Sequence, residues 1–233
     1  KKNTMLFEKE HIYHIFNQGN NREKIFFNHE NYLLFLRKME KYILPYADIL
    51  AWCLMPNHFH IMVYITKDSL SQREAIFTKT ETKDSLSQME AIFTKTETKD
   101  SLTQRETIFT DHKERTFNNS IGYLIRSYTQ AVNKSENRTG SLFKAHTKAE
   151  CVTKCEGITS SYFNTVFGTQ INVRIPEREY PVICWNYIHN NPVKAKLVEK
   201  PEDYIYSSYR DFCGLRNGKL INKIRAKEFG LFL

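Results

Sequence analysis

Residues 54–63, Leu-Met-Pro-Asn-His-Phe-His-Ile-Met-Val, constrain the fold more than any other part of the chain. Pro56 fixes φ near the value that a turn needs and Asn57 tolerates turn geometry, so the pair predicts a turn between two apolar runs. The run before it, Ala47–Met55, and the run that begins at His58 are both typical of strands. The segment therefore predicts a β-hairpin whose returning strand starts with a histidine.

The two histidines of the returning strand are candidate metal ligands. Alternate side chains of a strand share a face, so His58 and His60 are expected to point one way and Phe59 the other. Two imidazoles about 6–7 Å apart on one face can converge on a single cation. A His-x-His pair is also common on strands that bind no metal. The spacing alone therefore leaves a metal site and an ordinary sheet face both open.

The wider pattern predicts an α+β fold. Helical spacing of apolar residues marks two segments, Tyr32–Ile43 and Phe117–Asn133. We expect the first helix to be capped by Asn28, and the second by Asn118, Asn119 or Ser120. Strands are predicted at His11–Phe16, Ala47–Met55, from His58 onward, and at Ser141–Val152. Strand, helix, two strands, helix and strand give the ferredoxin-like βαββαβ order, a sandwich with its helices on one face of the sheet.

A further helix is expected after this unit. Pro176 or Pro181 would open it and Pro192 would close it. It would carry Tyr187 beside apolar residues, and on pattern alone a tyrosine in such a place is more often a core residue than a catalytic one.

Four motifs together resemble a known family. They are Tyr13–Asn21, the Met-Pro-Asn-His-Phe-His run at Met55–His60, the Gly-Ser-Leu-Phe run at Gly140–Phe143, and Tyr-Ile-His-Asn-Asn-Pro-Val at Tyr187–Val193. Jointly they resemble the REP-associated tyrosine transposases, relatives of the HUH single-strand transposases of small insertion sequences. The resemblance covers most of the chain, and the tyrosine-bearing helix lies outside the ferredoxin-like unit in that family too.

The resemblance implies a metal-dependent endonuclease and strand transferase that cuts hairpin-forming, single-stranded DNA. It implies that Tyr187 attacks the phosphodiester and forms a covalent 5′-phosphotyrosine. It also implies that His58, His60 and Asn191 hold Mg²⁺ or Mn²⁺. Asn190 stays an alternative to Asn191, because the residue before a proline is disfavoured in a helix. Two other functions stay open: a domesticated hairpin-DNA-binding protein without transposition activity, and an unrelated hydrolase that uses the two histidines alone.

The charge of the chain favours a polyanionic partner. Lys and Arg number 34 against 26 Asp and Glu, which gives a net charge of +8. A basic groove is the usual way to hold a single strand of DNA. The candidate DNA contacts are Arg138, Lys144, Lys148, Lys194, Lys196 and Arg210, and each of them is also explained as a solvated charge.

Composition also bears on location. No apolar run approaches the roughly 18 residues that a membrane span needs, and residues 1–6 do not resemble a signal peptide. The five cysteines are scattered, which fits a reducing compartment. We expect a bacterial cytoplasmic protein associated with the nucleoid, with no membrane partner, and both a monomer and a homodimer stay open.

An internal repeat occupies residues 67–112. Its period is 16 residues, as the copies beginning at Lys67, Lys83 and Lys99 show. The segment holds seven basic and nine acidic side chains, so the positive charge belongs to the rest of the chain. We therefore predict a catalytic domain formed by residues 1–66 and 113–233, with residues 67–112 inserted in it. The insertion is interpreted as a tolerated extension, or else as a spacer or protein contact.

Overall fold

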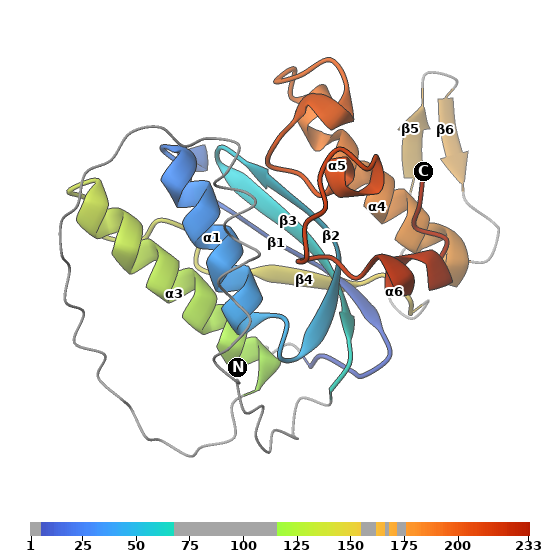
Figure 1. Cartoon of the computed structure of the whole chain (residues 1–233), viewed down its shortest axis with the longest axis horizontal. Helices are drawn as coiled ribbons and strands as arrows, with labels where there is room; N and C mark the ends of the chain where they lie inside the picture. The colour runs from blue at the N-terminus through green and yellow to red at the C-terminus, as the bar shows by residue number, and fades with distance from the viewer. Residues whose placement is uncertain (1–5, 68–115, 155–161, 166–167, 172–175) are drawn as a thin grey trace.

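A four-stranded antiparallel sheet, in the order β2-β3-β1-β4, lies at the centre of the molecule (Figure 1). The computed structural model describes residues 6–67, 116–154, 162–165, 168–171 and 176–233. The strands are β1 (Ile12–Gln18), β2 (Ala47–Met55), β3 (His58–Ile65) and β4 (Lys148–Cys151). The predicted hairpin is confirmed, since β2 pairs with β3 up to the Met55–His58 pair at the turn.

Helices α1 (His29–Tyr42) and α3 (Phe117–Ser135) pack against each other on one face of the sheet (Figure 1). The predicted cap of α1 is confirmed, because the Asn28 side chain accepts a hydrogen bond from the Asn31 backbone N–H. The caps predicted for α3 are wrong. Thr116 caps it and accepts from the Asn119 N–H. Ser120 lies inside the helix, which begins at Phe117, and its buried hydroxyl donates to the Tyr42 carbonyl across the helix pair at 2.7 Å.

Alternation along the strands divides the apolar side chains into two cores. Tyr13, Ile15, Phe59 and Ile61 belong to the core under α1 and α3. Neighbouring residues point the other way, into a second core that Trp185 and Ile188 of helix α4 help to close. The α+β class with an antiparallel sheet is therefore confirmed. The added helix α4 (Pro176–Lys194) covers the face of the sheet opposite to α1 and α3.

The strand predicted over Ser141–Val152 is much shorter, and only its end forms β4. Leu142 and Phe143 are both buried, but the segment makes only an isolated bridge to β1's end, between Phe143 and Gly19. The Asn17 side chain donates to the Lys144 carbonyl at 3.2 Å and to the Thr147 hydroxyl at 3.0 Å. These side-chain bonds hold the segment before β4 against β1 in place of a regular ladder.

Helix α4 continues two residues beyond its predicted end at Pro192. Pro192 cannot donate a backbone hydrogen bond, but the helix resumes, and the Ala195 N–H donates to the Asn191 carbonyl at 2.9 Å. Before α4, β5 (Tyr162–Thr165) and β6 (Gly168–Ile171) form a separate antiparallel pair. The repeats at residues 67–112 lie outside the described residues, apart from Lys67.

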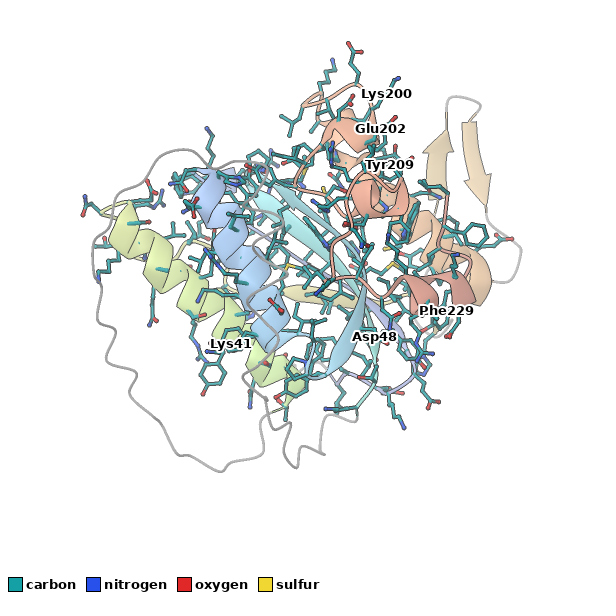
Figure 2. All side chains as sticks on the ribbon, in the orientation of Figure 1. Lys41, Asp48, Lys200, Glu202, Tyr209 and Phe229 are labelled. Carbon is teal, nitrogen blue, oxygen red and sulfur yellow. The ribbon has the colours of Figure 1, made fainter. Side chains whose placement is uncertain are left out.

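The C-terminal segment covers the edge strand β2 and bonds to it at several points. It contains η2 (Pro201–Asp203), α5 (Tyr209–Phe212) and α6 (Lys223–Glu228); the other short 3₁₀ turn, η1 (Asn20–Arg22), follows β1. Figure 2 shows Tyr209 and Glu202 together at one end of this segment, and Phe229 on the part that returns towards Asp48 of β2. Among the helices described, none has both the length and the hydropathy needed to cross a bilayer.

Candidate active site

A cleft of about 310 Å³ opens on the face of the sheet that carries the two strand histidines. Its walls come from β1, β3, the segment before β4, and α4. The lining side chains are Phe16, Asn17, Gln18, His58, His60, Lys144, His146, Lys148 and Tyr187. Segments more than 120 positions apart in the chain therefore meet in one polar, basic hollow.

His58 lies at the mouth of the cleft with one ring nitrogen fixed by its neighbour. The Asn57 side-chain oxygen lies 2.6 Å from His58 Nδ1, and the Asn57 amide nitrogen donates to the Arg22 carbonyl at 3.2 Å. Asn57 therefore presents an acceptor, and His58 Nδ1–H must be the donor. In the neutral ring this leaves a lone pair on His58 Nε2.

That lone pair faces another acceptor. His58 Nε2 lies 3.4 Å from Asn191 Oδ1, while the Asn191 amide nitrogen points to the Tyr187 carbonyl at 3.4 Å. Burial lowers the pKa of His58, which favours the neutral ring. Two lone pairs facing each other repel, unless a proton or a cation lies between them. The pair is therefore suited to binding a cation.

His60 is buried in the floor of the cleft next to a third imidazole, His14. His60 Nδ1 and His14 Nε2 share a hydrogen bond of 2.9 Å, and their rings stack at 5.0 Å. His60 Nε2 is buried and has no hydrogen-bond partner among the described residues. Burial lowers the pKa of His14 to about 4 and that of His60 well below its usual value, so both rings are neutral at pH 7.

Helix α4 presents Tyr187 to the histidines. Its neighbours Trp185 and Ile188 are buried in the second core and anchor the helix, whereas Tyr187 is 42% exposed. The Tyr187 ring lies 5.3 Å from the His60 ring, centroid to centroid. The Lys194 ammonium lies over the same ring at 5.2 Å. The phenol is thus accessible from the cleft, and it is not a core residue.

The structure places the two candidate asparagines differently. Asn191 contacts His58, whereas the Asn190 side chain donates back to the Asn186 carbonyl of its own helix at 2.9 Å. His189 is fully buried, bonds to the Ser208 hydroxyl at 2.8 Å and packs against Trp185 at 4.2 Å. His189 is therefore a packing residue of the second core.

The six candidate DNA contacts separate into two groups. Lys144 and Lys148 line the cleft, and Lys194 lies over Tyr187. The other three do not line the cleft. The Arg138 guanidinium pairs with Glu23 at 3.1 Å, and Arg210 donates to the Glu202 carbonyl at 2.7 Å. Lys196 is exposed beyond the end of α4.

The donor set limits which cation the site could hold. Within the described ranges, no group of three or more His, Cys, Asp or Glu side chains is placed to bind a metal ion. A cation here would therefore need the Asn191 amide oxygen together with His58 and His60. Mixed imidazole and oxygen ligands suit Mn²⁺ and tolerate Mg²⁺. The buried, unbonded His60 Nε2 and the facing acceptors of His58 and Asn191 fit such an ion.

Several residues in or beside the cleft are not predicted as site residues from the sequence. Phe16 lines the cleft, His14 bonds to His60, and Asn57 bonds to His58. The sequence predicts only a strand for the first two and a turn for Asn57. Their place follows from the pairing register, in which Phe16 lies opposite His60 and Gln18 opposite His58. The alternation of His14, Phe16 and Gln18 on one strand face is the sequence signal that could have indicated them.

Comparisons with known proteins add little to this geometry. No protein-family model matches the chain, and no curated protein matches it. Among solved structures, the chain is similar to a REP-associated tyrosine transposase bound to a REP hairpin, at 12% sequence identity and a TM-score of 0.47. The match covers 92% of this chain and 86% of the other.

Proposed function

We propose that this protein is a DNA endonuclease and strand transferase that cuts hairpin-forming single strands through Tyr187. The observation that carries the proposal is the meeting of an accessible phenol with His58, His60 and Asn191 in one basic cleft. The resemblance of the motifs that supply these residues to those of tyrosine transposases supports it. The strand order β2-β3-β1-β4 supports the ferredoxin-like arrangement that the proposal assumes.

In the proposed reaction, Tyr187 forms the new bond to phosphorus. As the Oη–P bond forms, the bond from phosphorus to the 3′ oxygen breaks, leaving a 5′-phosphotyrosine and a free 3′ hydroxyl. The phenol loses one proton to solvent and the leaving 3′ oxygen takes one up, so the step is balanced in protons. The phosphotyrosine retains the energy of the broken phosphodiester, so the 3′ hydroxyl of a second strand can reverse the step and join DNA. The polarity of the linkage is taken from the family resemblance.

The residues around Tyr187 have separate tasks in this scheme. His58, His60 and Asn191 would hold Mn²⁺ or Mg²⁺, which when bound would neutralise charge developing on the phosphate. Lys144 and Lys148 would hold backbone phosphates along the cleft. Helix α4 orients the phenol, because Trp185 and Ile188 fix that helix in the second core.

The decisive experiment looks for the covalent intermediate. The full chain is incubated with Mn²⁺ or Mg²⁺ and a hairpin DNA that has single-stranded flanks and a 3′ label, and the products are separated under denaturing conditions. We expect a labelled protein band that Tyr187→Phe abolishes. Tyr123→Phe is the matched control, because Tyr123 is equally exposed, at 42%, but lies on α3 across the sheet.

Other results would identify the alternatives. Tight binding of the hairpin without an adduct under either metal would indicate a DNA-binding protein that has no strand-transfer activity. Metal-dependent cleavage that survives Tyr187→Phe would indicate a hydrolase that uses the histidines alone.

A further inference from the structure

The two strand histidines are held in the same way, although their partners come from different elements. Asn57 occupies Nδ1 of His58 at 2.6 Å, and His14 occupies Nδ1 of His60 at 2.9 Å. In His58 the other ring nitrogen, Nε2, is directed to Asn191. In His60 the other ring nitrogen, also Nε2, has no hydrogen-bond partner among the described residues. A buried imidazole nitrogen without a partner is unfavourable, and Nδ1 of the packing residue His189 is another example. The two strand histidines differ from His189 because both line the same cleft.

We propose that His14 is a positioning residue that fixes the tautomer of His60, with Nδ1–H donated to His14 Nε2 and a lone pair kept on His60 Nε2. The inference rests on the proposed function, since that lone pair is what a cation would require. Only one proton can lie between His60 Nδ1 and His14 Nε2. If His14 donated it, His60 Nε2 would carry the remaining hydrogen of the neutral ring and could not bind a metal.

The surroundings of His14 support a fixed orientation. His14 is 7% exposed, and its ring packs on those of His60, at 5.0 Å, and Phe16, at 4.8 Å, with interplanar angles of 26° and 27°. Its position on β1, two strand positions before Phe16, faces the same side of the sheet as His60. Outer partners of this kind typically change metal affinity by about 10- to 100-fold when they are removed.

The test measures metal binding rather than activity. Calorimetric titration of the full chain with Mn²⁺ should show affinity about 10- to 100-fold weaker in His14→Leu, and His14→Gln, which restores an acceptor, should recover most of the loss. Thermal unfolding of each variant identifies any loss of fold. Equal Mn²⁺ affinity in folded His14→Leu and the unmodified chain would overturn the inference and leave the proposed function standing.

A second measurement does not depend on a variant that folds. Long-range proton–nitrogen correlation spectra of the metal-free protein distinguish the two neutral tautomers of each histidine. We expect the Nδ1–H form for His60 and also for His58. The Nε2–H form at His60 would overturn the inference. Failure of the unmodified chain to bind Mn²⁺ at all would instead remove the metal site, and the role of His14 with it.

Discussion

At the scale of single residues, Asn191 and Asn190 form a natural matched pair. They are adjacent on α4, but only Asn191 directs its side-chain oxygen to His58, while Asn190 bonds to its own helix. We expect Asn191→Ala to weaken Mn²⁺ binding by at least about tenfold and to reduce adduct formation as well. Loss of a residue that only hydrogen-bonds to a metal ligand already weakens binding by about tenfold or more, and a direct ligand should contribute at least as much. Asn190→Ala should leave both unchanged. Calorimetry and the adduct assay measure the two effects, and the reverse ranking would make Asn190 the ligand.

The lysines of the cleft give a second prediction at this scale. Lys144 and Lys148 line the cleft beside Tyr187, so each is placed to contact a phosphate of a bound strand. Replacing either one with alanine should weaken hairpin binding and reduce the slope of log affinity against log salt by about 0.7. Fluorescence anisotropy over a salt series measures this slope. Lys41→Ala on α1 is the control (Figure 2); a change as large in that variant would place the DNA elsewhere.

Part of this site could be predicted from the sequence, and the physical reason is local. His58 and His60 stand in a short motif whose spacing fixes their face on a strand, whereas Tyr187 and Asn191 were indicated by the family resemblance. The parts that could not be predicted depend on partners distant in the chain. His14 meets His60 only through the register of β1 against β3, and Asn57 is recognised as a hydrogen-bond acceptor only once its amide is seen to bond Arg22.

At the scale of elements, features that depend on local sequence could again be predicted, and features that depend on distant contacts could not. The hairpin of β2 and β3 and the cap of α1 follow from local turn and capping chemistry, and both are confirmed. The cap of α3 was wrong because the helix begins earlier, at Phe117, whose ring packs on Phe7 and Tyr46. The length of β4 was wrong because Asn17, on β1, binds the segment before it. Both differences result from contacts with another part of the chain, which a local sequence pattern does not show.

The C-terminal segment is held on β2 by a buried ion pair, which can be tested. Asp211 is 2% exposed and binds Arg216 through both carboxylate oxygens, at 2.9 and 2.6 Å, and it also accepts from the Gly218 N–H. Arg216 in turn donates to the Ser207 carbonyl at 2.6 Å, next to the bridge between Ser207 and Cys53 of β2. The pair therefore links α5 to the sheet edge.

Asp211→Ala should lower the free energy of unfolding by about 3 kcal/mol, because it leaves the Arg216 charge partly buried without its partner. Chemical denaturation monitored by circular dichroism measures the loss. Glu228→Ala is the control, since Glu228 pairs with Arg225 at an exposed site and should change stability by less than about 1 kcal/mol. Equal effects of the two substitutions would show that the buried pair contributes no more to stability than the exposed pair.

At the scale of the whole molecule, the described residues after β3 and at the start of α3 both contact Tyr46. The Lys67 N–H donates to the Tyr46 carbonyl at 3.3 Å, and the Tyr46 ring stacks on Phe117 at 5.5 Å between centroids. Tyr46 and Phe117 are both buried in the core under α1 and α3. Lys67 and Phe117, which stand on either side of residues 68–115, are therefore both held at Tyr46.

This closeness makes the predicted insertion testable. A chain in which residues 68–115 are replaced by a flexible linker about sixfold shorter should fold, and the shorter loop should raise the free energy of unfolding by about 1.5 kcal/mol through lower closure entropy. If residues 1–66 and 113–233 form the catalytic domain, the shortened chain should also keep hairpin binding and the Tyr187 adduct. Denaturation curves and the adduct assay separate the two parts. A shortened chain that folds but no longer binds the hairpin would assign DNA contacts to the repeats, and one that fails to fold would show that the repeats belong to the core.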